Sequence, residues 1–231
     1  MHWIHHYQLF LFDFDGILAD TEPLHFNAYK QMCQAHGFSL EWDLKTYALY
    51  ASMYGRSGLK KAIYHEFPTL MKHQPSWDVL YREKTLAYLE LLETQTVSLM
   101  PGIEFLLQAL NEANIKRAVV TNSPKEQIAL IRQKQPLLNT IPLWITREQY
   151  SEPKPASECY EKAIGELGEK GDRIIGFEDS PRGLRSLLGT RAEGVFVTPL
   201  MDSEQAKQLS LDIGRDFPHF SSFVDLLKVW Q

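Results

Sequence analysis

Short runs of apolar residues recur along the chain, and polar or acidic residues follow most of them. The first run, Leu9-Phe10-Leu11-Phe12, ends abruptly at Asp13. Uninterrupted apolar runs of this length are typical of strands that are buried on both faces of a parallel sheet. We therefore predict strands at five places: residues 9–12, 118–120, 143–145, 174–177 and 195–197.

Segments with the periodicity of amphipathic helices separate these runs. Apolar residues between 103 and 110 share one helical face, and so do those between 156 and 167. Gly168 follows the second pattern and is the residue type that commonly ends a helix. The alternation of strands and helices predicts an α/β fold, with a Rossmann-like, mostly parallel sheet that helices cover on both faces.

The stretch from about residue 22 to residue 95 follows a different pattern. It contains no convincing strand, and its apolar positions repeat with helical spacing in three segments: residues 24–35, 59–67 and 77–92. A helical block that is inserted directly after the first strand is typical of a small cap domain. We therefore predict a helical cap domain at residues 21–95 and an α/β core domain at residues 1–20 and 96–231.

Composition and charge narrow the function classes. Of the 231 residues, 44% are hydrophobic and 23% are charged, which excludes a disordered chain or a coiled coil. The net charge of −5 offers no basic surface for a nucleic acid or an anionic membrane. The two cysteines have no metal or redox spacing, and no apolar run approaches the length of a membrane span. We expect a cytoplasmic protein of undetermined oligomeric state that binds neither nucleic acid nor membrane.

Polar side chains cluster where the predicted strands end. In open parallel sheets, ligands bind beyond the carboxyl ends of the strands. Asp13 and Asp15 follow the first run, and the later runs are followed by Thr121-Asn122-Ser123, by Lys154, and by Glu178-Asp179. Each feature also has an ordinary structural explanation; for example, Ser123 and Glu126 fit a helix capping box, and a single lysine is commonly a surface residue. Their combination at successive strand ends predicts one shared crevice.

Phosphoryl transfer is the chemistry that uses such a set. Clustered carboxylates repel one another unless a cation neutralises them, and hard oxygen ligands beside a phosphate select Mg²⁺. One carboxylate can attack phosphorus, and a second can protonate the leaving oxygen and then activate water. A hydroxyl at a helix start can hold phosphoryl oxygens, and a lysine can offset the negative charge.

The chain resembles the phosphohydrolases of the haloacid dehalogenase superfamily that carry a helical cap, especially the enzymes like beta-phosphoglucomutase and phosphoglycolate phosphatase. Four segments carry the resemblance: Asp-Phe-Asp-Gly-Ile-Leu-Ala-Asp-Thr-Glu at residues 13–22, Val-Thr-Asn-Ser at 120–123, Lys-Pro at 154–155, and Phe-Glu-Asp-Ser-Pro-Arg-Gly at 177–183. Their order and approximate spacing hold across residues 8–198, which is nearly the whole chain.

The resemblance implies a role for each matching residue. Asp13 is then the nucleophile and Asp15 the general acid and base, while Thr121 and Lys154 bind the phosphoryl group. The implied Mg²⁺ ligands are Asp13, the backbone carbonyl of Asp15, Asp179, and Glu178 either directly or through its neighbours. The implied substrate contacts are Asn122 and, in the cap, His25 and Arg56, although a solvated loop position remains the alternative for Arg56.

The expected function is a Mg²⁺-dependent phosphatase that hydrolyses a small phosphorylated metabolite through an aspartyl-phosphate intermediate. The acid at position 15 favours phosphate esters over the substrates of dehalogenases and phosphonate-cleaving relatives, which lack it. Two alternatives remain open at this point. One is a sugar-phosphate mutase of the beta-phosphoglucomutase type, and the other, more distant one is a non-catalytic module that binds phosphate and Mg²⁺.

Overall fold

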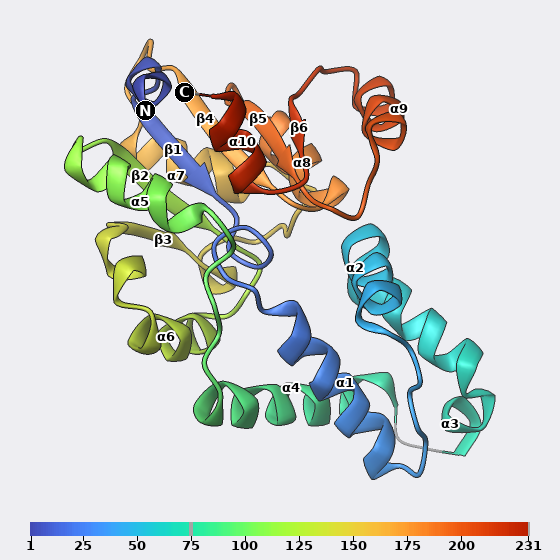
Figure 1. Ribbon diagram of the computed structural model, residues 1–231. Coiled ribbons are helices and arrows are strands. Elements are labelled where there is room, and N and C mark those ends of the chain that lie inside the picture. The colour runs from blue at the N-terminus through green and yellow to red at the C-terminus, as the bar shows by residue number, and fades with distance from the viewer. Residues whose placement is uncertain (74–75, 231) are drawn as a thin grey trace. The chain divides into compact units, whose positions relative to one another are not determined.

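The computed structural model describes residues 1–73 and 76–230 and contains a six-stranded sheet with helices around it (Figure 1). The strands are β1 (Leu9–Phe12), β2 (Lys116–Val120), β3 (Leu143–Ile145), β4 (Ile174–Glu178), β5 (Glu193–Val197) and β6 (His219–Phe220). All of their pairings are parallel, in the order β3-β2-β1-β4-β5-β6. The predicted α/β fold and its five predicted strands are confirmed.

The helices follow the strands in the alternation that the sequence indicates. The α-helices are α1 (Glu22–Ala35), α2 (Leu44–Glu66), α3 (Pro68–His73), α4 (Trp77–Thr94), α5 (Ile103–Glu112), α6 (Lys125–Lys134), α7 (Glu158–Leu167), α8 (Pro181–Leu188), α9 (Ser203–Ile213) and α10 (Phe223–Val229). Short 3₁₀ helices are η1 (His2–His6), η2 (Pro136–Thr140) and η3 (Arg147–Gln149). Helix α7 ends directly before Gly168, as predicted.

Strand β1 lies at the centre of the sheet, between β2 and β4. Its residues Leu9–Phe12 are fully buried, which explains why its sequence is apolar without alternation. Phe12 pairs with Val119 on one side and with Phe177 on the other. The strand order reverses at this point, so the loops after β1, β2 and β4 meet at one edge of the sheet.

Helices cover the sheet on both faces (Figure 1). Helices α7 and α8 pack on one face, and α5 and α10 lie over the other. Adjacent residues of β4 show the two contacts: the Phe177 ring meets the Phe223 ring of α10 at a centroid distance of 5.4 Å, whereas Gly176 faces Leu187 of α8.

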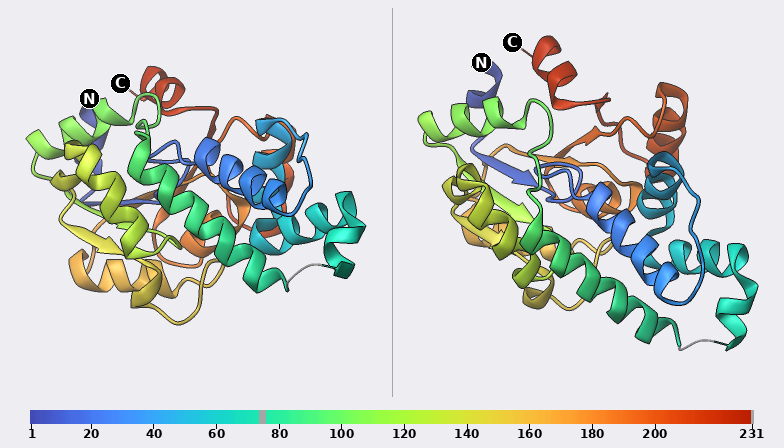
Figure 2. Two further views of the ribbon diagram at one scale, coloured as in Figure 1. Left: turned by 90° about the horizontal axis from the view of Figure 1, so that it is seen from below. Right: turned by 60° about the horizontal axis from the view of Figure 1, so that its bottom comes forward.

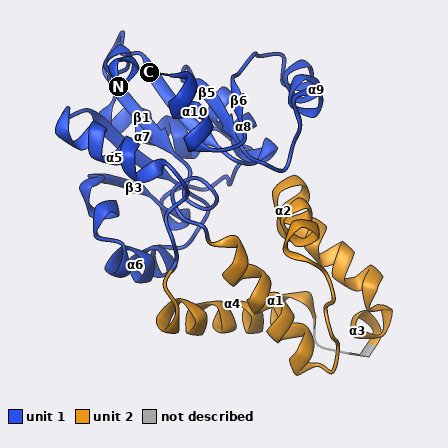
Figure 3. Ribbon diagram, in the orientation of Figure 1, with its two compact units in different colours: residues 1–20, 97–231 blue, residues 21–96 orange. Residues whose placement is uncertain are grey.

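The chain divides into two compact units (Figure 3). We call residues 1–20 and 97–231 the sheet unit and residues 21–96 the helical unit. Within the sheet unit, the segments that lead into and out of the helical unit pair with each other: the Asp20 amide donates to the Ser98 carbonyl at 2.9 Å, and the Met100 amide donates to the Leu18 carbonyl at 3.0 Å.

In the helical unit, α1 and α4 run side by side around an aromatic core (Figures 1 and 2). The predicted pattern at residues 59–67 covers only the second half of α2, which begins at Leu44 and is bent at Gly55. Helix α3 and the two-residue edge strand β6 lack a predicted counterpart, because neither is long enough to show a period. No helix in the described part of the chain has the length and apolar character to cross a membrane.

The contact between α8 and β4 generates a test of the fold. A Cβ atom at Gly176 would lie 2.5 Å from Leu187 Cδ1 and 2.7 Å from Leu187 Cδ2, and Leu187 is fully buried. Gly176→Ala is therefore expected to lower the free energy of unfolding by about 1–3 kcal/mol in urea titrations. Gly165→Ala is the control, since a Cβ there meets nothing within 4 Å and helix propensity favours alanine by up to about 1 kcal/mol. Equal stability of the two variants would contradict the packing described.

Candidate active site

Asp13 and Asp15 lie in the loop that follows β1. The Asp13 amide donates to the Phe177 carbonyl of β4 at 3.0 Å, which continues the ladder between the strands and holds Asp13 at the sheet edge. Gly16 then turns the chain with a φ of 74°, a left-handed conformation that glycine adopts without strain. A Cβ at Gly16 would lie 2.3 Å from Asp179 Oδ2, so this glycine also admits the Asp179 carboxylate to the loop.

Lys154 is buried at the centre of the site, with only 5% of its surface exposed. Its Nζ donates to Asp13 Oδ1 at 2.9 Å, to Glu178 Oε1 at 2.6 Å and to the Val120 carbonyl at 2.8 Å. The alternative of a solvated surface lysine is therefore wrong. The Tyr160 hydroxyl is a fourth, more distant acceptor at 3.2 Å, and together these contacts give the Lys154 side chain one defined orientation.

The Thr121-Asn122-Ser123 segment follows β2, next to the loop that carries Asp13. Thr121 is fully buried, and its hydroxyl oxygen accepts from the Ser123 amide at 3.0 Å. The Tyr150 hydroxyl donates to the Thr121 carbonyl at 2.8 Å and lies 2.6 Å from Asn122 Oδ1. These contacts hold the segment in a fixed turn at the carboxyl end of β2.

Ser123 does not cap helix α6, and this corrects the capping-box interpretation. Pro124 occupies the cap position in an extended conformation, so Ser123 lies one residue too early in the chain to cap the helix. Glu148 instead accepts from the Lys125 amide, at 3.1 and 3.2 Å. The Ser123 hydroxyl instead donates to Asp15 Oδ2 at 2.5 Å, a short hydrogen bond of the kind that a charged carboxylate accepts.

Asp13, Glu178 and Asp179 form an acidic cluster that could hold a metal ion, with one ligand oxygen from each within 4.8 Å of the others. Glu178 is fully buried, and its Oε1 accepts from Lys154 and from the Tyr160 hydroxyl, the latter at 2.5 Å. Its Oε2 is buried as well and has no hydrogen-bond partner among the described residues. A buried carboxylate oxygen without a donor fits a cation ligand.

The electrostatics of the site reflect a shortage of positive charge. Burial, together with the nearby Glu178 and Asp15 carboxylates, raises the pKa of Asp13 to about 7, although the charge and hydrogen bond of Lys154 act to lower it. Although burial alone would lower the pKa of Lys154, Asp13 and Glu178 raise it above its ordinary value, so the ammonium stays charged. The cluster of three acidic side chains thus has one lysine, which pairs with Asp13 and Glu178, and a divalent cation would offset the remaining negative charge.

The two residues assigned to the cap, His25 and Arg56, lie in the helical unit, and each has partners there. His25 Nδ1 lies 2.7 Å from the Lys84 ammonium group, and its ring stacks on Tyr88 at a centroid distance of 3.8 Å. The Arg56 guanidinium lies 3.7 Å from the centre of the Tyr81 ring and donates to Asp78 Oδ1 at 2.7 Å. Contact of either residue with a substrate stays a prediction.

Sequence reasoning missed Tyr160 and Lys84 as polar members of these clusters. Tyr160 belongs to the apolar face of α7, so its spacing indicates only that it is buried and not that its hydroxyl reaches Glu178. Lys84 is 4% exposed on α4, surrounded by tyrosine rings. A lysine within an apolar helical face is the one sequence signal that could have marked it.

Comparison with known proteins agrees with this geometry. The family model described as haloacid dehalogenase-like hydrolase matches residues 10–196. CbbY of Cereibacter sphaeroides is 30% identical over 185 residues, which cover 78% of this chain and 79% of that protein. Hexitol phosphatase A of Escherichia coli is 27% identical over 202 residues, or 87% of this chain and 88% of that protein.

A solved structure shows the same fold. A crystal structure of a CbbY variant from Rhodobacter sphaeroides, in complex with xylulose-(1,5)bisphosphate, superposes with a TM-score of 0.69. The two chains are 25% identical, and the alignment covers 95% of this chain and 96% of that one. The resemblance inferred from the four sequence segments is thereby confirmed. The chain belongs to the haloacid dehalogenase-like hydrolases, and within that family it is a phosphoric monoester hydrolase.

Proposed function

We propose that this protein is a Mg²⁺-dependent phosphatase that hydrolyses a small phosphorylated carbohydrate through an aspartyl-phosphate at Asp13. The observation that carries the proposal is the contact of Asp13 Oδ1 with Lys154 Nζ at 2.9 Å, at a sheet edge where Asp15, Thr121 and two further acids converge. A buried carboxylate oriented by an ammonium group is suited to act as a nucleophile rather than as a solvated turn residue.

Asp13 and Asp15 divide the chemistry between them. In the first step an Asp13 carboxylate oxygen forms a bond to phosphorus, the bond from phosphorus to the ester oxygen breaks, and Asp15 gives that oxygen its proton. In the second step Asp15 takes a proton from water, whose oxygen bonds to phosphorus and releases Asp13. The hydrogen bond from Ser123 to Asp15 Oδ2 supports this role, because it holds the Asp15 carboxyl in one orientation.

Thr121, Asn122 and Lys154 are the proposed contacts of the phosphoryl oxygens. The Thr121 oxygen accepts from the Ser123 amide, which leaves its hydroxyl proton to be donated to a phosphoryl oxygen. Lys154 contributes a fixed positive charge beside the nucleophile. Such preorganised donors stabilise the charge that develops on the phosphoryl group in the transition state.

Asp13, Glu178, Asp179 and the Asp15 backbone carbonyl are the proposed ligands of Mg²⁺. The unpartnered Oε2 of Glu178 and the excess of acidic groups support this assignment. When bound, the cation offsets the repulsion between these carboxylates and the oxygens of an incoming phosphate.

The substrate class rests on the relatives. One relative is named a hexitol phosphatase, and the CbbY variant binds a pentulose bisphosphate, so we assign a phosphorylated carbohydrate to this chain as well. We further propose that residues 21–95 act as the cap that selects it, with His25 and Arg56 among its contacts. Both cysteines are buried free thiols, which suits a cytoplasmic location.

Phosphate release from a panel of sugar phosphates tests the proposed roles of the two acids. We expect Mg²⁺-dependent release, a fall in kcat of about 10⁴-fold or more in Asp13→Asn, and a fall of about 10²–10⁴-fold in Asp15→Asn. The amide of asparagine can neither attack phosphorus nor exchange a proton with the leaving oxygen. Asp212→Asn, on the exposed side of α9, is the matched control and should keep full activity.

Retention of activity in Asp13→Asn would contradict the assigned nucleophile. Conversion of a sugar-phosphate isomer without net release of phosphate would instead identify a mutase. If the unaltered protein neither releases phosphate nor converts sugar-phosphate isomers, the result would favour a non-catalytic binding module.

The raised pKa of Asp13 predicts how Mg²⁺ binding depends on pH. In the metal-free protein this carboxyl is protonated below about pH 7, and it must lose the proton before it can bind a cation. The apparent Mg²⁺ affinity should therefore fall by about tenfold for each pH unit below 7 and level off above it. Isothermal titration calorimetry between pH 5.5 and 8.5 measures this. A pH-independent affinity in the unaltered protein would rule out Asp13 as the titrating ligand, and Asp13→Asn should bind weakly at every pH.

A further inference from the structure

Helix α2 is bent at Gly55, and the bend creates a hollow within the helical unit. Gly55 has a φ of 58° and a ψ of −155°, a combination that is essentially restricted to glycine. The residues before and after it keep helical geometry, so two helical segments meet at an angle. A cavity of about 560 Å³ lies against them, within the usual size range of small-molecule sites.

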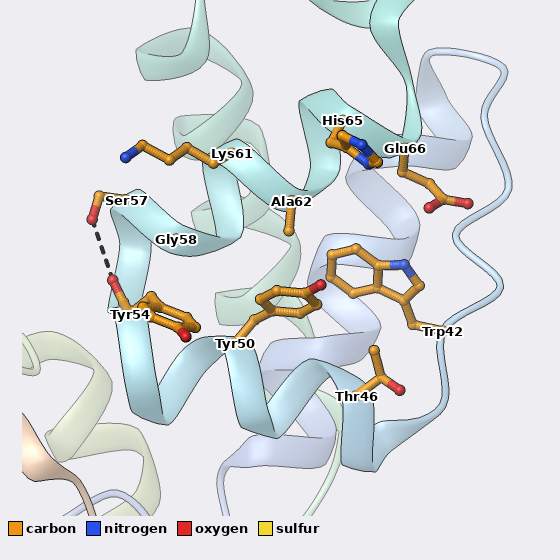
Figure 4. Close-up of a pocket in the computed structure, with 10 residues that line it drawn as sticks. All are labelled: Trp42, Thr46, Tyr50, Tyr54, Ser57, Gly58, Lys61, Ala62, His65 and Glu66. Carbon is orange, nitrogen blue, oxygen red and sulfur yellow. Dashed lines mark hydrogen bonds between the residues drawn. The ribbon is translucent and has the colours of Figure 1, made fainter.

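The residues that line this hollow are partly aromatic and partly polar (Figure 4). They are Trp42, Thr46, Tyr50, Tyr54, Ser57, Gly58, Lys61, Ala62, His65 and Glu66. Trp42, Tyr50 and Tyr54 lie along one side, and Lys61 and His65 lie on the opposite side (Figure 4). All of them belong to the helical unit and none to the sheet unit that carries Asp13.

The aromatic side offers a row of ring surfaces. The centroids of the Trp42 and Tyr50 rings are 5.1 Å apart, and the ring planes make an angle of 30°. The centroids of the Tyr50 and Tyr54 rings are 6.5 Å apart. Trp42 and Tyr50 also pack on the hydrophobic core of the unit, which fixes their positions, whereas Tyr54 is 61% exposed. Rings held in place beside an open cavity are suited to stack on a flat ligand.

The opposite side supplies positive charge. Lys61 and His65 both lie on the second half of α2 and line the hollow, Lys61 at the end near Ser57 and His65 at the end near Glu66 (Figure 4). Lys61 forms no ion pair among the described residues, and the acidic lining residue Glu66 lies at the His65 end of the hollow (Figure 4). An anionic group near Lys61 would therefore gain an attraction that an uncharged ligand lacks.

We propose that this hollow is a second ligand site, which binds a planar aromatic ring carrying an anionic group. The ring stacks on Tyr54 with Tyr50 beside it, and the anion lies at Lys61. A nucleoside monophosphate has both parts, and AMP is the probe we choose. A ligand that has only the ring, or only the anion, would contact one side of the hollow and not the other.

Calorimetric titration with AMP, adenosine and ribose 5-phosphate tests the site. EDTA is included, because without a cation the acidic cluster at Asp13 repels phosphate. We expect AMP to bind at least tenfold more tightly than adenosine or ribose 5-phosphate. Tyr54→Ala and Lys61→Gln should each weaken AMP binding by about fivefold or more, because the first removes the stacking ring and the second removes the positive charge beside the anion.

Two further variants make the result specific. Ala62→Phe places a ring in the hollow and should abolish AMP binding, with the folded state checked by circular dichroism. Lys60→Gln is the matched control, because Lys60 neighbours Lys61 but does not line the hollow, and it should bind AMP like the unaltered protein. The absence of AMP binding at millimolar concentration, or equal binding by the unaltered protein, Tyr54→Ala and Ala62→Phe, would overturn the proposal.

An independent observation concerns Tyr160, a fully buried residue of α7. Its hydroxyl donates to Glu178 Oε1 at 2.5 Å, and Lys154 donates to the same oxygen at 2.6 Å. Two strong donors on one carboxylate oxygen prevent rotation of the group and leave the other oxygen, Oε2, without a donor.

We infer that Tyr160 is a positioning residue, which aims Glu178 Oε2 at the cation; this inference rests on the proposed Mg²⁺ site. The Tyr160 hydroxyl also accepts from Lys154 Nζ, at the longer distance of 3.2 Å. Mg²⁺ affinity in the absence of substrate reports on the Glu178 carboxylate, because Lys154 is not a proposed ligand of the cation. Groups that orient metal ligands commonly change metal affinity by about 10–100-fold when they are removed.

Tyr160→Phe removes only the hydroxyl, and Mg²⁺ titration in the absence of substrate measures the consequence. We expect the dissociation constant to rise at least tenfold. Tyr150→Phe is the matched control, because its hydroxyl is also hydrogen-bonded in the core but does not contact Glu178, and its Mg²⁺ affinity should stay within twofold. If the unaltered protein binds no Mg²⁺, the proposed function fails along with this inference. If it binds Mg²⁺ and Tyr160→Phe binds equally well, only the positioning role is overturned.

Discussion

Two carboxylates, those of Asp13 and Glu178, lie within hydrogen-bonding distance of one buried ammonium group, that of Lys154. Charges that are removed from water in this way are stable only as a hydrogen-bonded set, and removing one partner of a buried pair typically costs about 3–5 kcal/mol. The three residues come from the loop after β1, the loop after β3 and the end of β4. The contact therefore ties together three segments that are distant in sequence, and it orients the Asp13 and Glu178 carboxylates.

The backbone around this contact leaves little freedom for other side chains. A Cβ at Gly183 would lie 1.9 Å from Glu178 Oε2, and Gly16 gives Asp179 the same close approach on the other side. The site thus combines tight packing with crowded negative charge, and the burial and the crowding disfavour the charged form of Asp13. The proposed Mg²⁺ would supply the positive charge that these crowded carboxylates lack, and it would thereby also allow an anionic phosphate to approach them.

The strands of the sheet and the position of the polar residues that follow them can be predicted from the sequence. The strand at Leu9–Phe12 is apolar throughout because it is buried on both faces, and parallel pairing then brings the residues after each strand to one edge. The hydrogen-bond partners of those residues could not be predicted from the sequence. Ser123 matches a capping motif, yet the fold places its hydroxyl beside Asp15, and Tyr160 is one apolar-face residue among several until α7 packs on the sheet. Such contacts depend on how the elements pack in the folded chain, to within about an ångström. The periodicity of apolar residues in the sequence does not predict packing at that scale.

The pairing of residues 18–20 with residues 98–100 has a consequence for how this chain can change over evolutionary time. The helical unit leaves and re-enters the sheet unit through two hydrogen-bonded neighbouring segments, so its two ends are held together by the sheet unit itself. Insertions, deletions or a complete exchange of the intervening helices need not shift any strand, because the closure is already made. Selection can therefore alter the helical unit while the residues around Asp13 keep their geometry. The two units can then vary independently of each other.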